Sequence, residues 1–454
     1  MKPKTIRKLL VANRGEIAIR ILRACTELEI ETVAVYTYED RYSLHRYKAD
    51  EAYQIGEEQD PLKPYLDIEA IIRVAKDCGA DAIHPGYGFL SENFEFARRC
   101  RENNIIFVGP DPEVMQQLGD KVLAKQIARQ CQVPLIESSQ QPLTSYDIAK
   151  EEARRIGYPV MLKAAAGGGG RGMRVVRSEE QLEKCFDEAR REAKNAFGDD
   201  TVFFEKFIEN PKHIEVQIVG DHHGNVMHLF ERDCSLQRRF QKIVEVAPAF
   251  NLPDAAKQEV YNYAVSICTA VNYNNVGTVE FLVDQSGKVY FIEVNPRIQV
   301  EHTVTEMVTG IDLVKTQIRI AQGHDLYGEV IALPKQEDVR VNGYAIQCRI
   351  TTEDPENDFM PDYGTVLAYR SAEGFGIRLD EGSVYNGVKI SPFFDSLLVK
   401  VTAHSTTIQD ATYKLKRALN EFRIRGVKTN IRFLLNIISH PEFIAGNATV
   451  NFLQ

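Results

Sequence analysis

Residues 160–176 read VMLKAAAGGGGRGMRVV. Two strand-like runs, Val160 to Lys163 and Met173 to Val176, flank a loop with four consecutive glycines. Glycine adopts backbone conformations that other residues avoid, so this loop can bring its N–H groups close to an anion. The spacing matches neither the Walker phosphate loop nor the dinucleotide fingerprint. The stretch therefore predicts a hairpin from a different phosphate-binding fold, and a flexible hairpin tip is the alternative.

The residues on either side of this hairpin predict two different kinds of sheet. Residues 9–12, 32–36, 82–84 and 105–108 read as strands, each followed by a turn and an amphipathic stretch, which is typical of a parallel, doubly wound sheet. Beyond residue 208 the pattern favours an antiparallel sheet with helices. We therefore expect an α/β and α+β chain in three parts: an N-terminal doubly wound α/β domain over 1–134, a glycine-rich lid over 135–207 and a C-terminal α+β region over 208–454.

Composition excludes several classes of function. The 454-residue chain has a net charge of −9 and a pI near 5.7, which argues against a nucleic-acid partner. Its eight cysteines are scattered without a C-x-x-C pair, so the sequence predicts neither a disulfide framework nor a zinc site. The apolar run at 9–12 is too short for a signal peptide or a membrane span. We expect a cytoplasmic protein with no membrane partner.

Two carboxylates lie on strands that a hairpin turn can pair. Residues 277–283 and 289–295 alternate as strands, and Asp284 to Gly287 is a good turn between them. Pairing would bring Glu280 near Glu293 and Asn295, which share a face. Oxygen ligands of this kind suit Mg²⁺ or Mn²⁺ bound together with phosphates. The alternative is a pair of solvated strand carboxylates.

Two further segments carry charges that could serve a reaction. Residues 296–302 follow the second strand, where Arg297 could hold an anionic substrate and Glu301 could take a proton. Residues 231–242 form a basic run whose alternative explanation is a solvated surface patch. Residues 84–89, with the order His-Pro-Gly-Tyr-Gly-Phe, are explained well enough as a structural turn.

Taken together, the segments 12–18, 84–89, 167–173, 231–242 and 293–301 closely resemble the biotin carboxylases, over essentially the whole chain. The detailed sequence, as at residues 38–50, is closer to the pyruvate carboxylase type than to the bacterial acetyl-CoA carboxylase type. The resemblance implies an ATP-grasp fold with an N-terminal α/β domain, a glycine-rich lid and a catalytic α+β domain. It also implies that MgATP and bicarbonate are used to carboxylate N1′ of biotin through carboxyphosphate.

The resemblance also implies roles for individual residues. Those expected to hold the nucleotide are Lys121, Lys163, Gly168, Gly169, Gly170, Met173, Glu205, Lys206, His213, Gln237 and Glu280, and those expected to hold Mg²⁺ or Mn²⁺ are Glu280, Glu293 and Asn295. Those expected around bicarbonate are Lys242, Arg297, Gln299 and Val300, with Glu301 as the base. Arg349 would stabilise negative charge on biotin, and Tyr87 and Gly88 would seat its ureido ring.

One departure and two alternatives accompany this interpretation. Phe240 stands where the family usually has histidine, which allows a lost hydrogen bond near the nucleotide. Another ATP-grasp ligase is a rival, and so is a non-catalytic ATP-binding module. The sequence shows no carboxyltransferase domain and no biotin-carrier domain, so we expect a biotinylated carrier and a carboxyltransferase as partners. A homodimer is expected because relatives commonly dimerise through this domain.

Overall fold

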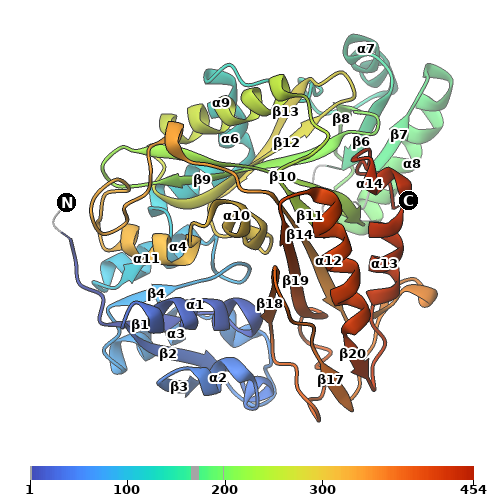
Figure 1. The fold of residues 1–454 in the computed structure, drawn as a ribbon. Helices are drawn as coiled ribbons and strands as arrows, with labels where there is room; N and C mark the ends of the chain where they lie inside the picture. The colour runs from blue at the N-terminus through green and yellow to red at the C-terminus, as the bar shows by residue number, and fades with distance from the viewer. Residues whose placement is uncertain (1–2, 165–172, 198, 454) are drawn as a thin grey trace.

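The computed structural model describes residues 3–164, 173–197 and 199–453, and for residues 196 and 197 the backbone alone. The predicted phosphate contacts Gly168, Gly169 and Gly170 therefore lie outside the described residues. Figure 1 shows three regions: a blue N-terminal layer, a green lid at the upper right, and a long sheet that runs through the molecule.

The N-terminal region is a parallel sheet in the order β3-β2-β1-β4-β5. Its central strand is buried from Leu9 to Val11, because Leu9, Leu10 and Val11 pack into cores on both faces of the sheet. Asn13 follows that strand and donates to the carbonyls of Pro85 and Tyr87, which fixes the loop after β4. The elements are β1 (Lys8–Val11), α1 (Gly15–Glu27), β2 (Glu31–Tyr36), α2 (Leu44–Lys48), β3 (Glu51–Gln54), α3 (Ile68–Asp77), β4 (Ala82–His84), α4 (Phe94–Glu102) and β5 (Ile106–Phe107).

The lid is a small antiparallel sheet in the order β7-β6-β8, with α7 and α8 packed against it. Residues 160–164 alternate between buried and half-buried, as expected for a strand with one face on a core. The paired β6 and β7 confirm the predicted hairpin on both sides of the glycine loop. The elements are α7 (Tyr146–Ile156), β6 (Val160–Ala164), β7 (Met173–Val176), α8 (Glu179–Phe197) and β8 (Val202–Lys206).

The long sheet has the order β13-β12-β9-β10-β11-β14-β19-β18, and its strand pairs are antiparallel. It continues from the predicted carboxylate strands into the C-terminal part of the chain (Figure 1). Its strands are β9 (Lys212–Gly220), β10 (Val226–Arg238), β11 (Gln241–Ala247), β12 (Asn275–Val283), β13 (Val289–Asn295), β14 (Tyr344–Thr351), β18 (Ile377–Glu381) and β19 (Leu397–Ser405).

Helices cover this sheet and close its cores. The helix α9 packs on β9 and β10, α10 packs on β10, β11 and β14, and α12 packs on β14 and β19. Short strand pairs, β15 with β16 and β17 with β20, complete the C-terminal part. The remaining bounds are α9 (Asp254–Ala270), α10 (His302–Thr309), α11 (Leu313–Ala321), α12 (Ile408–Glu421), α13 (Ile431–Ser439), α14 (Pro441–Ile444), β15 (Glu353–Asp354), β16 (Met360–Pro361), β17 (Ala368–Arg370) and β20 (Arg423–Arg425).

These sheets confirm the predicted α/β and α+β class. The helices α5 (Pro112–Gly119) and α6 (Lys121–Gln130) precede residue 134 in the chain, but they pack against the long sheet. Leu118 and Ala124 on these helices pack in the core beneath the long sheet, because their apolar faces meet β13. The boundaries 1–134, 135–207 and 208–454 stay a prediction. Within the described residues, no helix is long and apolar enough to cross a membrane.

Candidate active site

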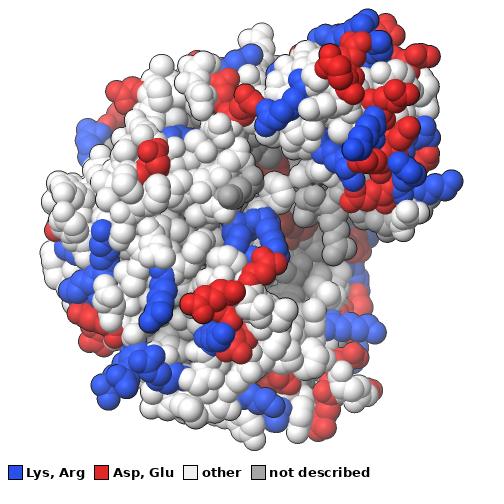
Figure 2. Space-filling model, turned by 90° about the vertical axis from the view of Figure 1, so that its right-hand side faces the viewer, with Lys and Arg blue, Asp and Glu red and all other residues white. Residues whose placement is uncertain are grey.

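A cleft of about 1620 Å³ lies where the three regions meet. It is lined by loops of the N-terminal region, by the lid strands β6 to β8, by the long sheet, and by the loop between β18 and β19. Pockets for one ligand usually measure ~300 to 1000 Å³, so this cleft has room for more than one substrate. Figure 2 shows this face of the molecule hollowed, with acidic and basic side chains around the opening.

The ammonium of Lys242 is the centre of the charged part of this cleft. Lys242 is the second residue of β11. Its ammonium lies 2.7 Å from Glu301 and 2.9 Å from Glu280, and it also pairs with Glu215. Burial alone would lower the pKa of Lys242, but the three carboxylates raise it well above its ordinary value. Lys242 is therefore a permanent cation at neutral pH.

Glu301 and Arg349 form the second half of this arrangement. Glu301 lies at the start of α10 and is 2% exposed, and its second oxygen accepts from Arg349 on β14 at 3.0 Å. Arg349 also donates to Glu245 at 2.6 Å. Burial alone would raise the pKa of Glu301, but the charges of Lys242, Arg349 and Arg232 hold it well below its ordinary value. The carboxylate of Glu301 is ionised at any pH at which the protein works.

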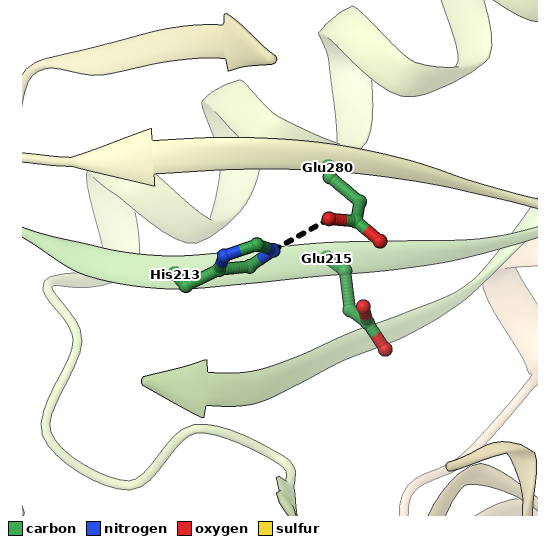
Figure 3. Close-up of side chains that lie close together, drawn as sticks. All are labelled: His213, Glu215 and Glu280. Carbon is green, nitrogen blue, oxygen red and sulfur yellow. Dashed lines mark hydrogen bonds and ion pairs between the residues drawn. The ribbon is translucent and has the colours of Figure 1, made fainter. Parts of the chain in front are cut away.

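A hydrogen-bonded chain runs from β10 to β12 through His213. Gln237 contacts His213 Nδ1 at 2.9 Å, and His213 Nε2 lies 2.7 Å from Glu280. Figure 3 shows His213 and Glu215 on β9 and Glu280 on the neighbouring β12, with their side chains converging on one point. The ligand atoms of these three residues lie within 4.8 Å of one another. However, oxygens of Glu215 and Glu280 already hold the ammonium of Lys242, so this cluster is engaged by a cation of the protein.

The predicted metal ligands lie together at the β12–β13 pair. Glu280 and Glu293 are direct cross-strand partners, and Asn295 donates to Glu280 at 2.8 Å. Burial raises the pKa of Glu293, and the neighbouring charge of Glu280 raises it further. A divalent cation relieves this repulsion, and carboxylate and amide oxygens are the ligands that Mg²⁺ prefers. The residues present therefore fit a magnesium site.

The charge balance of the ion-pair network also favours a bound cation. Glu280 is 5% exposed, which is far from the solvated strand carboxylate of the alternative explanation. Buried carboxylates without matching cations are costly, so a bound cation stabilises such a set. Among the described side chains linked by these ion pairs the carboxylates outnumber the cations: Glu215, Glu245, Glu280 and Glu301 against Lys242, Arg232 and Arg349.

The lid side of the cleft holds the expected phosphate contacts. Lys121 begins α6 and lines the cleft, and Lys163 pairs with Met173 across β6 and β7. Lys163 forms an ion pair with Glu205, whose other oxygen lies 3.2 Å from Lys125. A phosphate that binds Lys163 would therefore compete with a carboxylate of the protein.

The side chain of Lys206 has a different partner from the one expected. Lys206 lines the cleft on β8, but its ammonium donates to the carbonyls of Gly157 and Tyr158 at 2.8 and 3.0 Å. These bonds hold the turn before β6 against β8. The structure thus places Lys206 at the cleft and engages its charge in the lid.

The expected biotin-side residues lie at the junction with the N-terminal region. The hydroxyl of Tyr87 donates to Glu16 at the start of α1, and Gly88 follows with a left-handed φ of 69°. Burial and the charge of Glu16 raise the pKa of Tyr87 well above its ordinary value. Tyr87 is therefore a neutral hydrogen-bonding group at the cleft wall.

The expected bicarbonate residues line the floor beside Glu301. Gln299 is buried, donates to Glu280 at 2.7 Å and accepts from Arg232 at 2.9 Å. Val300 lines the cleft next to it. The guanidinium of Arg297 lies 3.2 Å from Glu92 and donates to Asn295 at 3.1 Å. Gln299 and Val300 are thus brought next to Lys242 and Glu301, whereas Arg297 is bonded toward the metal-ligand side.

Sequence reasoning gave no role to Arg232, Glu215 or Glu245. Arg232 is fully buried and bonds Glu215, so the solvated patch proposed as an alternative for residues 231–242 is wrong at this position. The signal was present on β9, where His213, Glu215 and Gln217 alternate with buried apolar residues. Polar side chains on one face of a buried strand need partners, which predicts a site on that face.

Comparisons with known proteins agree with this geometry. The family model of the biotin carboxylase N-terminal domain matches residues 5–115, that of the carbamoyl-phosphate synthase L chain ATP-binding domain matches 120–328, and that of the biotin carboxylase C-terminal domain matches 347–454. The pyruvate carboxylase of Staphylococcus aureus strain Mu50 is 56% identical over 99% of this chain and 39% of its own length. The chain spans about two fifths of the length of the curated relatives it matches.

Solved structures of separate biotin carboxylase domains and subunits match over nearly their full length. The biotin carboxylase domain dimer of the 2-oxoglutarate carboxylase from Hydrogenobacter thermophilus, in complex with MgADP, ADP and bicarbonate, is 47% identical with a TM-score of 0.90, covering 99% of this chain and 97% of its own. The biotin carboxylase subunit of a pyruvate carboxylase is 49% identical with a TM-score of 0.86, covering 99% and 98%. These matches confirm the expected ATP-grasp architecture. The chain belongs to the biotin carboxylase family.

Proposed function

We propose that this chain carboxylates N1′ of biotin with MgATP and bicarbonate, through carboxyphosphate, as the first half-reaction of a pyruvate carboxylase. The observation that carries the proposal is the buried pairing of Glu301 with both Lys242 and Arg349 in a cleft with room for two substrates. Such a set offers a base and two fixed cations for an anionic reaction.

The residues of the chain divide the reaction between them. Glu301 takes the proton of bicarbonate, while Lys242 and Arg349 hold the anion beside it. Bound Mg²⁺ would be held by Glu280, Glu293 and Asn295 and would neutralise charge on the phosphates. Lys121 and Lys163 neutralise the remaining phosphate charge, and the lid excludes water because carboxyphosphate hydrolyses readily. Arg349 then stabilises negative charge on the ureido oxygen.

A second function is favoured by one observation. The family model over residues 120–328 is that of a carbamoyl-phosphate synthase ATP-binding domain, so another ATP-grasp ligase is the alternative. Carboxylation of biotin separates the two, because a different ligase has no use for biotin.

The test measures ATP hydrolysis by the full chain with MgATP, with and without bicarbonate and free biotin. We expect turnover that needs bicarbonate, rises with biotin and falls 100-fold or more in Glu301→Gln. The control is Glu51→Gln. Glu51 does not line the cleft, and its carboxylate lies 2.6 Å from the ammonium of Lys8. Turnover that ignores biotin and Glu301 would favour the other ligase.

The proposed function includes partners and a compartment. A biotinylated carrier and a carboxyltransferase would complete the pyruvate carboxylase reaction, because the relatives are longer than this chain.

A homodimer is proposed as well, and the 91% exposed Phe375 is the kind of apolar side chain that a partner covers. Sedimentation of Phe375→Asp against wild type tests this. A cytoplasmic location is supported by eight free cysteines, all among the described residues, and cell fractionation tests it.

A further inference from the structure

A buried lysine outside the set of expected site residues connects the N-terminal side of the cleft to the loop before α10. Lys400 on β19 has no exposed surface, although it carries an ammonium. It is the direct cross-strand partner of Arg349 on β14 and of Asp380 on β18. Directly opposed residues share a face of the sheet, so Lys400 lies beside the guanidinium that serves the reaction.

The ammonium of Lys400 has two contacts that no other described side chain combines. It lies 3.1 Å from Glu16, at the start of α1 in the N-terminal region. It also donates to the carbonyl of Val300 at 2.9 Å. The carboxylate of Glu16 in turn accepts from Tyr87. One side chain therefore joins the biotin side of the cleft to the loop that leads into Glu301.

The bond to Val300 has a direct geometric consequence. The peptide unit is planar, so a bond that fixes the Val300 carbonyl also fixes the N–H of Glu301 in the same plane. Glu301 directly precedes α10, and its side chain leaves the backbone from this peptide toward Lys242 and Arg349. A small rotation here would move the carboxylate away from both cations.

The energetics argue against a purely stabilising purpose. Moving an ammonium out of water is costly, and nearby carboxylates, here Glu16 and Asp380, often offset that cost only in part. Burial raises the pKa of Glu16, and the charge of Asp380 raises it further, although Lys400 opposes both effects. Apolar residues would fill this junction at less cost. Retention of such a pair is therefore better explained by orientation than by stability.

We propose that Lys400, together with Glu16, is a positioning residue that orients the Val300–Glu301 peptide and couples it to Tyr87. This inference rests on the proposed carboxylase function. Lys400 touches no reacting atom in this role and acts through Glu301. Its removal should slow turnover and leave nucleotide binding unchanged, because the nucleotide contacts lie on the lid and on β9, β10 and β12.

The test uses the double variant Lys400→Met/Glu16→Gln, which leaves no unpaired buried charge. Replacing a buried ion pair with neutral groups is often close to neutral for stability, so the variant should fold. We expect kcat of bicarbonate-dependent, biotin-stimulated ATP hydrolysis to fall tenfold or more, while KM for ATP and the affinity for MgADP stay within twofold. The control Lys8→Met loses matching contacts, to Glu51 at 2.6 Å and to the Cys78 carbonyl at 3.2 Å, and should keep full kcat.

Three outcomes would overturn the inference. A folded double variant with kcat within twofold of wild type shows that the pair does not orient Glu301. An equal loss of MgADP affinity and kcat shows a general distortion of the cleft. Wild type that fails to turn over with bicarbonate and biotin removes the proposed function, and the positioning role falls with it. The wild-type assay thus separates the two failures.

Discussion

The ammonium of Lys242 lies 2.7 Å from the carboxylate of Glu301, the group proposed to act as the base. A carboxylate held by a cation is a weak base, because its ionised form is stabilised. Bicarbonate is itself an anion and would compete with Glu301 for Lys242 and Arg349. The arrival of the substrate would therefore return basicity to Glu301 at the moment when it is needed.

Lys242→Met should therefore damage both stability and turnover. Removing the ammonium leaves Glu215 with Arg232 alone and takes a cation from Glu280 and Glu301, and breaking a buried ion pair typically costs about 3 to 5 kcal/mol. Turnover should fall 100-fold or more, because bicarbonate loses its cation. Urea unfolding and ATP hydrolysis measure the two effects. Lys212→Met, which loses an ion pair to Asp233 at 2.9 Å, should cost stability while keeping turnover.

The pH dependence of bicarbonate turnover follows from the pKa of Glu301. That pKa lies well below its ordinary value of 4.5, and a base acts only when it is deprotonated. Activity due to Glu301 is therefore present above this pKa and is lost only as the pH falls through it, far below neutrality. We expect no acid limb from Glu301 in kcat/KM for bicarbonate from about pH 6 to 8.

Two variants sharpen this measurement. Rates must first be corrected for conversion of bicarbonate to CO₂ at low pH. Arg349→Met removes one of the charges that lower the pKa of Glu301, so this pKa should rise. As the pH falls, the residual activity of the variant should therefore begin to decline at a higher pH than that of wild type. An acid limb near pH 6.5 in wild type that vanishes in Glu301→Gln would contradict the assignment.

Much of the fold could be predicted because local patterns and packing agree. Residues 9–12 form a continuous apolar run, and such a run is typical of a strand buried on both faces. The turn at Asp284 to Gly287 could be predicted, and it pairs Val283 with Val289. A register shift between Phe281 and Glu280 then makes Glu293 the partner of Glu280, and no local pattern predicts that shift. The packing of α5 and α6 beneath the long sheet depends on contacts between distant segments, which no local pattern encodes.

The site residues also fall into those that the sequence could predict and those that it could not. Glu280, Glu293 and Glu301 lie on or just after two strands that a turn joins, so their proximity could be expected from the sequence. The place of Lys242 beside them was implied only by the resemblance. Lys400 lies in an ordinary strand pattern, and its importance comes from a contact 100 residues away in the chain. Tertiary pairing of that kind becomes visible only when the strands are assembled.

Asp40→Asn should destabilise the N-terminal region. Asp40 is 2% exposed and accepts from Arg14 at 2.7 Å and from Tyr65 at 2.6 Å. Burial alone would raise the pKa of Asp40, but the hydrogen bond and charge of Arg14 lower it to about 2. That shift from the ordinary 3.8 corresponds to about 2 kcal/mol of stability. The substitution also leaves the half-buried Arg14 without its charged partner, so the cost should be about 2 to 4 kcal/mol.

The pH dependence of that cost provides the check. A carboxylate with a lowered pKa contributes its full stability above its ordinary pKa, and the contribution is lost as the pH falls through about 2. The difference between wild type and Asp40→Asn in urea unfolding should be constant from about pH 5 to 8 and shrink below 3.8. The exposed Asp77→Asn is the control. A difference that grows on acidification would contradict the ion-pair explanation.

Phe240→His tests a position at which the resemblance leads us to expect histidine. Arg239 and Phe240 form the two-residue turn between β10 and β11, with left-handed φ values of 51° and 66°. A phenylalanine in this conformation is strained, and at 65% exposure its side chain gains little from burial. Histidine tolerates left-handed φ better and supplies a hydrogen-bonding group at the cleft.

Two readouts distinguish strain from lost binding at Phe240. The free energy of unfolding of Phe240→His should rise by up to about 1 kcal/mol, because the turn is relieved. KM for ATP should fall severalfold if the missing hydrogen bond limits nucleotide affinity. Phe94→His, at an exposed position on α4, controls for the change of side chain alone. Higher stability with an unchanged KM would mean that the turn is strained and that phenylalanine at this position does not weaken the binding of ATP. An unchanged stability would show instead that the surrounding sheet absorbs the strain.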